Sequence, residues 1–299
     1  MALAQNIGKA GAARAHRHEF VAKMILRSAA GFVIVAIAAL IAYLASEGTK
    51  LFTHDHVSPL TFLFSPNFNP DAGAPGSLVF IVGSLAITLF AIVVGGPFGI
   101  AVGIFMSELA PRRVVDAMKP AIEVLVGIPS IVYGWLGLTL LVPFIRNATG
   151  SNGFGLLAAG IVLSVMILPT IITLSEDALR VQPIALREGS LALGATRWQT
   201  IWRVLLPAAA SGLSVAVILG IARAIGETMA VQLVIGNAGV LPKGLLSATA
   251  ALPTEIVMDM SGAQQGSLLE HALFSMALLL LLIAMALILA VRIALRKRT

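Results

Sequence analysis

The sequence predicts an all-α, polytopic membrane protein with six transmembrane helices. Of its 299 residues, 58% are hydrophobic and only 11% are charged. The mean hydropathy of +0.97 lies outside the range of a water-soluble domain with one buried core. The apolar residues are also gathered into long segments, and a helix needs about 20 such residues to cross a bilayer.

Six segments qualify as membrane spans. The second and fifth are longer than one straight crossing requires, so we expect tilt or an extension beyond the membrane there. A basic region precedes the first segment, but its apolar run is too long for a cleavable signal, and we expect a retained helix. The spans are residues 27–46, 78–106, 121–145, 155–175, 208–235 and 269–292. They form a membrane domain of residues 28–292 between an N-terminal tail, 1–27, and a C-terminal tail, 293–299.

The distribution of basic residues predicts the orientation. Most of the 20 Lys and Arg residues lie in the N-terminal tail, after the second span, in residues 176–207 and at the C-terminus. The opposite side has only Lys50, Arg146 and Lys243. Positive charge marks the cytoplasmic side, so both termini are predicted to be cytoplasmic. The net charge of +6 is therefore explained by orientation in a lipid bilayer, and no nucleic-acid partner is predicted.

The external loops give weaker signals. Residues 47–76 and 236–268 are either irregular linkers on the membrane surface or a landing surface for an external protein, and composition does not decide between these. His54 and His56 are potential metal ligands, but no third ligand is evident beside them, so a solvated loop is favoured and no metal site is predicted. The absence of cysteine excludes disulfides and thiolate chemistry.

Residues 176–207 form a polar, basic, helix-prone loop on the predicted cytoplasmic side. Pro183 can open a first helix, Gly194 can end and redirect it, and Thr196 can cap a second helix. Trp198 and Trp202 share one face of that second helix. The loop is either an amphipathic hairpin at the membrane surface or a docking surface for a partner.

Arg223 and Glu227 are ionisable residues inside the predicted fifth span. Their spacing places them on one face of a helix, where each is expected to neutralise the other. The pair either fixes packing or serves transport: the guanidinium suits a phosphate-like oxyanion, and the carboxylate can hold the arginine or accept a hydrogen bond from a protonated phosphate. From Pro207 to Arg223, a straight helix of about 24 Å would act as a lever.

Several motifs resemble one transporter family. Within 176–207, Glu188-Gly189-Ser190, Gly194 and Leu206-Pro207 resemble the signature loop of ABC-importer permeases. Residues 222–231, with Ile235-Gly236-Asn237, are similar to the fifth span of the PstC-type permease of phosphate importers. Residues 105–111 and 126–134 add to this ordered set. The resemblance covers most of residues 78–292 and implies a type I ABC-importer permease fold with cytoplasmic coupling helices.

The resemblance implies a function and partners. The chain would be half of the translocation pathway of an ATP-driven phosphate importer in the cell inner membrane. Its partners would be a PstA-type permease, a dimer of PstB-type ATPases that dock on the signature loop, and an external phosphate-binding protein. Arg223 and Glu227 would belong to the phosphate pathway. Pro129 and Ser130 would either line that path or form a simple proline kink.

The chain itself is not expected to be an enzyme. It has no Gly-x-x-x-x-Gly-Lys-Ser/Thr loop, so ATP and Mg are expected on the partner ATPase, with no cofactor on this chain. The alternatives are a permease for another oxyanion, such as molybdate, sulfate or phosphonate, and a non-ABC channel or membrane scaffold.

Overall fold

Long helices dominate the computed structural model, which describes residues 2–296 and the side chains of residues 23–293. The first part of the chain has two long helices joined by a short folded segment. Its elements are α1 (Ala2–Gly48), α2 (Lys50–Thr53), α3 (Pro59–Phe64), β1 (Phe68–Asn69), the 3-10 turn η1 (Pro70–Ala72), β2 (Ala74–Pro75), α4 (Leu78–Ile104) and the π-helical segment η2 (Phe105–Leu109). The strands form one antiparallel pair, in which Phe68 lies opposite Pro75.

The second part of the chain is helical throughout, with several breaks. Its elements are α5 (Arg112–Gly127), α6 (Ser130–Leu136), the π-helical η3 (Gly137–Leu141), α7 (Val142–Thr149), α8 (Leu156–Arg180), α9 (Ile184–Ala192), α10 (Arg197–Thr200), the π-helical η4 (Ile201–Leu205), α11 (Leu206–Ala208), α12 (Ala210–Ile225), α13 (Met229–Gln232), α14 (Leu252–Met260) and α15 (Leu268–Arg296).

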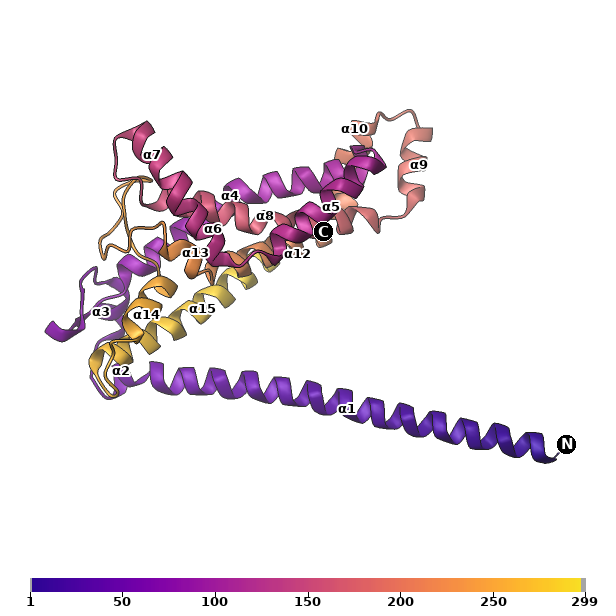
Figure 1. The fold of residues 1–299 in the computed structure, drawn as a ribbon, viewed down its shortest axis with the longest axis horizontal. Helices are drawn as coiled ribbons and strands as arrows, with labels where there is room; N and C mark the ends of the chain where they lie inside the picture. The colour runs from indigo at the N-terminus through magenta and orange to yellow at the C-terminus, as the bar shows by residue number, and fades with distance from the viewer. Residues whose placement is uncertain (1, 297–299) are drawn as a thin grey trace.

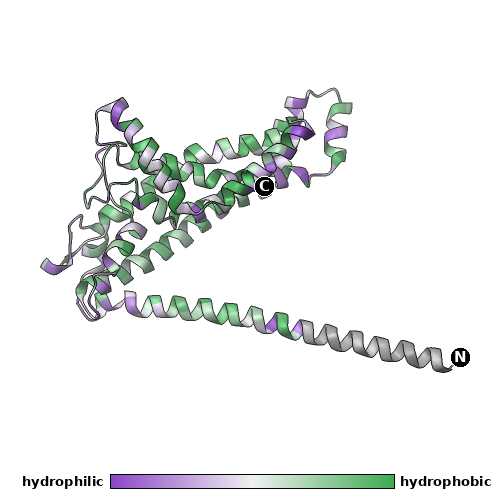
Figure 2. Ribbon diagram, viewed as in Figure 1, coloured by the Kyte–Doolittle hydropathy of each residue, from purple (hydrophilic) through white to green (hydrophobic). Residues whose placement is uncertain are grey.

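The predicted all-α polytopic fold is confirmed. Among the described residues, five helices are long and apolar enough to cross a membrane. The count reaches six if the run Arg197–Ala208 and α12, which are bent by 71° against each other, form one broken span. Figure 2 shows hydrophobic residues along α4, α8 and α15, whereas polar residues gather around α9 and α10.

The centre of the bundle is the contact between α4 and α8. Gly95, Gly99 and Gly103 are spaced four apart on α4 and all face α8. A side chain at Gly99 would begin 2.9 Å from the Cβ of Ile171, and one at Gly103 would begin 2.6 Å from the Cβ of Ser175. These small residues let the two helices approach closely, as is common between membrane helices.

The first membrane helix stands apart from this core. The apolar part of α1 has none of its residues buried, and α1 diverges from the bundle in Figure 1. It is joined to α15 near its C-terminal end, where the rings of Tyr43 and Phe274 meet edge to face at 5.9 Å. The hydroxyl of Ser275 also donates to the carbonyl of Gly48 at 2.6 Å. The exposed face of α1 needs lipid or another protein to cover it.

The predicted third span, 121–145, is wrong in its position. Pro129 separates two helices, α5 and α6, and the apolar crossing is Ser130–Thr149. Ile128, which precedes the proline, is extended with ψ of 126°, as the steric effect of proline on its neighbour requires. Residues 121–127 therefore belong to α5, a separate helix that begins at Arg112.

The predicted fifth span, 208–235, is also wrong as a single helix. α12 ends at Ile225, and Gly226 connects it to the short helix α13. At the other end the chain bends by 71° at Ala209. Pro207 has no N–H with which to continue the helix from the preceding turn, and that turn is the π-helical η4. The segment from Pro207 to Arg223 is thus bent, whereas a straight helix was expected.

The two ends of the molecule differ. In Figure 1 the C-terminal end of α15 lies on the same side of the view as α9 and α10. The opposite side carries α2, α3, α7 and α14. The region expected as an N-terminal tail, 1–27, continues α1 as a helix from Ala2; the last residues of the expected C-terminal tail, 297–299, lie outside the described part.

Candidate functional site

Arg223 lies in the last turn of α12, where it meets α8. Its Nη1 donates a hydrogen bond to the hydroxyl of Thr170 at 3.0 Å. Thr170 follows Pro169, which lies inside α8 and is buried. Arg223 and Thr170 are both half-buried, so the guanidinium lies between the helices and is still accessible.

The expected ion pair between Arg223 and Glu227 does not form. The helix ends between the two residues, so they do not share a helix face. Instead the Oε1 of Glu227 accepts a hydrogen bond from the backbone N–H of Ala230 at 3.3 Å, at the start of α13. Arg223 has no carboxylate within 4.0 Å among the side chains that the structure describes. The two ionisable groups are therefore available separately.

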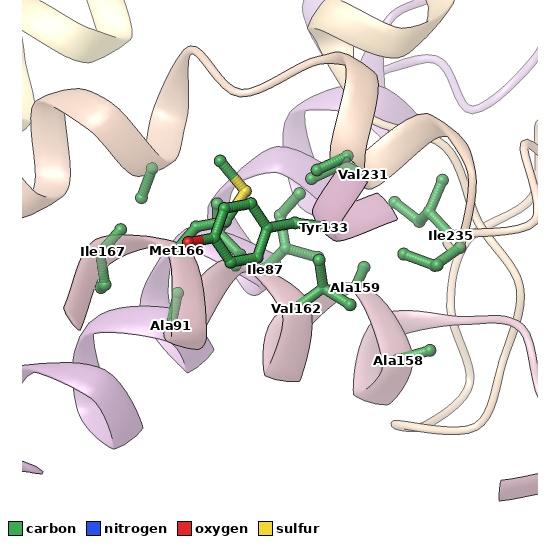
Figure 3. Close-up of a cluster of buried hydrophobic side chains, with 14 of the residues drawn as sticks. Ile87, Ala91, Tyr133, Ala158, Ala159, Val162, Met166, Ile167, Val231 and Ile235 are labelled. Carbon is green, nitrogen blue, oxygen red and sulfur yellow. The ribbon is translucent and has the colours of Figure 1, made fainter. Parts of the chain in front are cut away.

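The hydrophobic cluster beside this site contains one phenol. Tyr133, on α6, packs among Ile87, Val162 and Met166 from α4 and α8 (Figure 3). Its hydroxyl donates to the carbonyl of Leu125 in α5 at 2.7 Å. Tyr133 thus joins α6 to α5 across the break at Pro129.

Pro129 and Ser130 lie one turn before Tyr133. Pro129 is exposed and ends the helical path of α5, and Ser130 is half-buried as the first residue of α6. The structure, which describes both side chains, gives Ser130 no hydrogen bond to Arg223 or Glu227. At Pro129 the chain is therefore divided into two separate helices, which is more than a kink in one helix. No direct contact joins Pro129 or Ser130 to Arg223.

Arg223 has hydrogen-bonding capacity to spare. A guanidinium carries five N–H donors in a planar fork, and one hydrogen bond to Thr170 leaves most of them unused. A permanent positive charge inside a membrane span is costly unless protein, water or an anion compensates it. With no carboxylate paired to it, Arg223 is suited to two-point contact with an oxyanion.

The two helices and the turn predicted within residues 176–207 are confirmed, except that residues 176–180 belong to the end of α8. α9 begins after Pro183, and Gly194 redirects the chain with φ of 83°. Thr196 then caps α10: its hydroxyl accepts from the N–H of Gln199 at 3.2 Å, and the Gln199 side chain accepts from the N–H of Thr196 at 2.9 Å. The second helix differs from the prediction only in being divided into α10, η4 and α11.

The outer surface of this loop is unpartnered in the single chain. None of the residues of α9 is buried, and Glu188 and Gly189 are exposed. Leu193, at the tip, is 90% exposed, although it is apolar. Ser190 faces inward, within 3.0 Å of the hydroxyl of Thr200, whereas Leu206 is half-buried and Pro207 exposed.

Two exposed tryptophans extend this apolar surface. Trp198 and Trp202 pack edge to face with ring centroids 5.7 Å apart, as their shared helix face predicted. Exposed apolar residues grouped in this way are typical of a protein interface or a membrane surface.

An ion pair joins this loop to the membrane core. The guanidinium of Arg187 donates from Nε to Oε2 of Glu108 at 3.1 Å and from Nη2 to Oε1 at 2.7 Å. Glu108 lies in η2, at the end of α4. Arg187 also donates to the carbonyls of Leu179 and Gln182, which connect α8 to α9. Arg187 therefore bonds α9 directly to the end of α4 and to the end of α8.

The sequence predictions missed the residues that bond Arg223 and Arg187. Thr170 could have been found as a polar residue beside a proline in an apolar span. Glu108 is an acidic residue next to the end of a span, but its distance of 79 residues from Arg187 carries no local signal. The buried Glu176 was also missed: its pair with Lys119 of α5 at 3.0 Å is distant in the sequence, whereas its pair with Arg180 at 3.1 Å has the four-residue spacing of a helix and could have been found.

Comparison with protein-family models identifies one match. Residues 99–298 match the model described as "Binding-protein-dependent transport system inner membrane component". The match includes residues 176–207 and Arg223, and so covers both the loop and the arginine site.

Curated relatives cover almost the whole chain. A probable ABC transporter permease protein, YqgH of Bacillus subtilis, is 48% identical over 273 residues, which are 90% of this chain and 88% of the relative. The phosphate transport system permease protein PstC of Pasteurella multocida is 31% identical over 301 residues, which are 93% of each chain.

Solved structures share the fold. A chain of the bacterial alginate ABC transporter aligns with a TM-score of 0.65 at 15% identity, covering 92% of this chain and 93% of that one. A chain of the MetNI methionine ABC transporter, in an inward-facing conformation, aligns with a TM-score of 0.54 at 24% identity. The alignment covers 73% of this chain and 93% of that one. The type I ABC-importer permease fold expected from the sequence motifs is thereby confirmed.

Proposed function

Because this chain belongs to the family of binding-protein-dependent transport system inner membrane components, we propose that it is the permease subunit of an ATP-driven phosphate importer. An ABC-importer permease works with an ATPase and a substrate-binding protein. We assign the finer identities by the likeness to PstC: a PstA-type permease as the other half of the pathway, a PstB-type ATPase dimer, and an external phosphate-binding protein.

The observation that carries the phosphate assignment is the unpaired guanidinium of Arg223. It lies half-buried at the end of α12, with one hydrogen bond to Thr170 and no carboxylate beside it among the described side chains. A phosphate oxyanion can take up the remaining donors in a two-point contact. Because no described carboxylate lies within 4.0 Å of Arg223 to compete with the anion, the guanidinium can bind it as it passes.

Glu227 gives a basis for selecting phosphate over fully ionised anions. It lies just past the end of α12, half-buried and not paired with Arg223. A carboxylate can accept a hydrogen bond from an oxyanion that still carries a proton, but it repels one that has none. Phosphate carries a proton near neutral pH, whereas sulfate does not. Glu227 therefore favours phosphate when both anions reach Arg223.

We propose that α9 and α10 dock on the ATPase. Glu188, Gly189 and the tip at Leu193 are exposed, and Gly194 fixes the angle between the two helices. Closure of the ATPase on ATP would push α9, and the Arg187–Glu108 pair would pass the movement to α4. ATP and Mg would be held by the ATPase, because this chain has no phosphate-binding loop of its own.

The topology follows from the same assignment. The docking loop must face the cytoplasm, where ATP is hydrolysed. The C-terminal end of α15 lies on the same side of the molecule as α9 (Figure 1). This agrees with the surplus of Lys and Arg in both terminal segments, and we therefore place both termini in the cytoplasm.

The proposal is tested by uptake of labelled phosphate into vesicles that hold the reconstituted complex. The proposed function requires uptake that depends on ATP and on the binding protein, and that excess sulfate or molybdate does not inhibit. Uptake without ATP would indicate a channel. Strong competition by sulfate or molybdate would indicate a permease for another oxyanion.

A further inference from the structure

The fold brings together three potential metal ligands on the side of the molecule opposite to α9. They are His54 and Asp55, which follow α2, and His271, in the first turns of α15. One ligand atom from each of the three lies within 4.8 Å of the other two. The sequence showed only His54 and His56, whereas the structure supplies the missing ligands from Asp55 and, 216 residues farther along, His271.

The carboxylate of Asp55 lies between the two imidazoles. Its Oδ2 is 2.6 Å from Nδ1 of His271, and its Oδ1 is 3.1 Å from Nδ1 of His54. The two rings face each other edge to face with centroids 5.7 Å apart. Both Nδ1 atoms therefore point toward the same carboxylate, and the hydrogen-bonded cluster brings together two imidazole nitrogens and a carboxylate.

Two of these ligands are largely buried and one is exposed. The side chain of His271 is only 6% exposed and that of Asp55 is 17% exposed, whereas that of His54 is 74% exposed. The buried residues Leu51, Ala272 and Leu273 pack in one hydrophobic cluster and fix α2 against α15. Asp55 and His271 are thus held next to each other by the fold, and His54 is accessible to an ion from solvent.

We propose that His54, Asp55 and His271 form a binding site for a transition-metal dication of the Zn²⁺ type. Around Zn²⁺, nitrogen and oxygen ligands lie about 2.0–2.2 Å from the metal, so neighbouring ligand atoms in a tetrahedron are roughly 3.4 Å apart. The contacts of Asp55 with the two imidazoles, at 2.6 and 3.1 Å, are hydrogen-bond distances and shorter than this spacing, so an ion would replace these hydrogen bonds and the ligand atoms would move apart around it. Two imidazoles and one carboxylate suit Zn²⁺ and its neighbours, whereas Mg²⁺ and Ca²⁺ prefer oxygen ligands.

The bound ion would join the first membrane helix to the last. α2 follows directly after α1, and α1 otherwise contacts the bundle only near its C-terminal end in the described region. A metal ion that bridges Asp55 and His271 would stiffen this junction, which lies on the side of the molecule opposite to the ATPase-docking loop. Three protein ligands leave the fourth position for water or for a group from a partner protein.

The test uses the full-length chain in its purified complex, stripped with a chelator and kept in a buffer free of phosphate. Zn²⁺ affinity is measured by competition with a chromophoric chelator, and Co²⁺ is added to give the visible absorption bands of a tetrahedral site. We expect one Zn²⁺ per chain, visible Co²⁺ bands, and no response to Mg²⁺ or Ca²⁺.

His54→Ala is the informative variant, because His54 is exposed and its loss leaves the Asp55–His271 contact intact. Since removal of an outer partner of a ligand already weakens metal binding about 10- to 100-fold, loss of a direct ligand should weaken it by about tenfold or more. His56→Asn is the matched control: His56 is exposed, lies in the same loop, and has φ of 56°, a conformation that asparagine tolerates.

Three outcomes overturn the proposal. The first is the absence of stoichiometric Zn²⁺ binding, which would leave the cluster as a hydrogen-bonded contact alone. The second is equal affinity in the wild type and His54→Ala. The third is equal weakening by His54→Ala and His56→Asn, which would indicate binding by the loop as a whole. Weakening by His54→Ala alone, with the same melting temperature as the wild type in chelator, supports the site.

Discussion

Arg187 in the docking helix α9 and Glu108 at the end of α4 form a two-point ion pair, with N–O distances of 2.7 and 3.1 Å. Their side chains are 23% and 10% exposed, so the pair is largely screened from water. It is the ionic contact through which the loop holds the core helix α4. The proposed coupling between the docking loop and α4 therefore depends on this pair.

Breaking this pair is expected to uncouple the ATPase from transport. Glu108→Gln leaves the guanidinium partly buried without its counter-charge, and such a loss costs about 3 kcal/mol or more. We expect ATP hydrolysis by the complex to continue while phosphate uptake per ATP falls severalfold. The double variant Glu108→Arg with Arg187→Glu should recover part of the uptake, and no recovery would mean that the pair acts through something other than its charges.

Gly99 is expected to be essential for the contact of α4 with α8. A Cβ at this position would lie 2.8 Å from Cγ2 of Ile171, and overpacking of this kind costs about 1–3 kcal/mol. Gly99→Ala should therefore lower the melting temperature of the purified complex. Gly96→Ala is the matched control, because the nearest atom to its Cβ is 3.8 Å away. Equal melting temperatures for the two variants would contradict the close-packing account.

Gly194 is expected to set the angle between the two docking helices. Its φ of 83° is unfavourable for any residue with a Cβ, and an alanine there costs about 1–2 kcal/mol. Gly194→Ala should therefore weaken ATPase binding, measured by co-purification of the subunits. Gly189→Ala, inside α9 with no atom within 4 Å of its Cβ, should instead stabilise the helix by about 0.5–1 kcal/mol. Normal binding by Gly194→Ala would show that the turn tolerates another conformation.

Glu255 in α14 predicts a pH dependence of stability. Burial, followed by the neighbouring charge and hydrogen bond of Asp259, raises the pKa of Glu255 from 4.5 to about 7. Folding therefore favours the protonated form. Its contribution to stability is complete below pH 4.5 and is lost as the pH rises toward 7.

Glu255→Gln is the variant that isolates this effect. Because glutamine stays neutral, the variant should melt at a higher temperature than the wild type at pH 8, with a smaller difference at pH 5. A difference between the two proteins that does not change with pH would show that the carboxyl titrates in its ordinary range.

Local signals in the sequence were enough to predict the docking loop. Pro183, Gly194 and Thr196 each act on the backbone within a few residues, so the first helix, the turn and the cap all lie where they were expected. The apolar segments likewise predicted the second, fourth and sixth spans, because membrane helices are defined by their own composition.

The site around Arg223 could not be predicted in the same way. The pairing with Glu227 assumed a continuous helix, whereas the chain leaves the helix at Gly226, between the two residues. The third span was misplaced because residues 121–127 are apolar enough to be counted with it, although Pro129 ends their helix. The contact of Asp55 with His271 depends on the tertiary fold, which local patterns do not reveal.

The central claim is that Arg223 binds phosphate during transport. Its most direct test is ATP-dependent uptake of labelled phosphate by reconstituted vesicles carrying Arg223→Ala. A hydrogen bond to a charged group contributes about 1.5–3 kcal/mol, so we expect uptake to fall roughly 10- to 100-fold in a normally assembled complex. Arg146→Ala is the control, because Arg146 is exposed and bonds only the carbonyl of Asn152 among the described residues; it should transport normally. Wild-type uptake by assembled Arg223→Ala complexes would contradict the account.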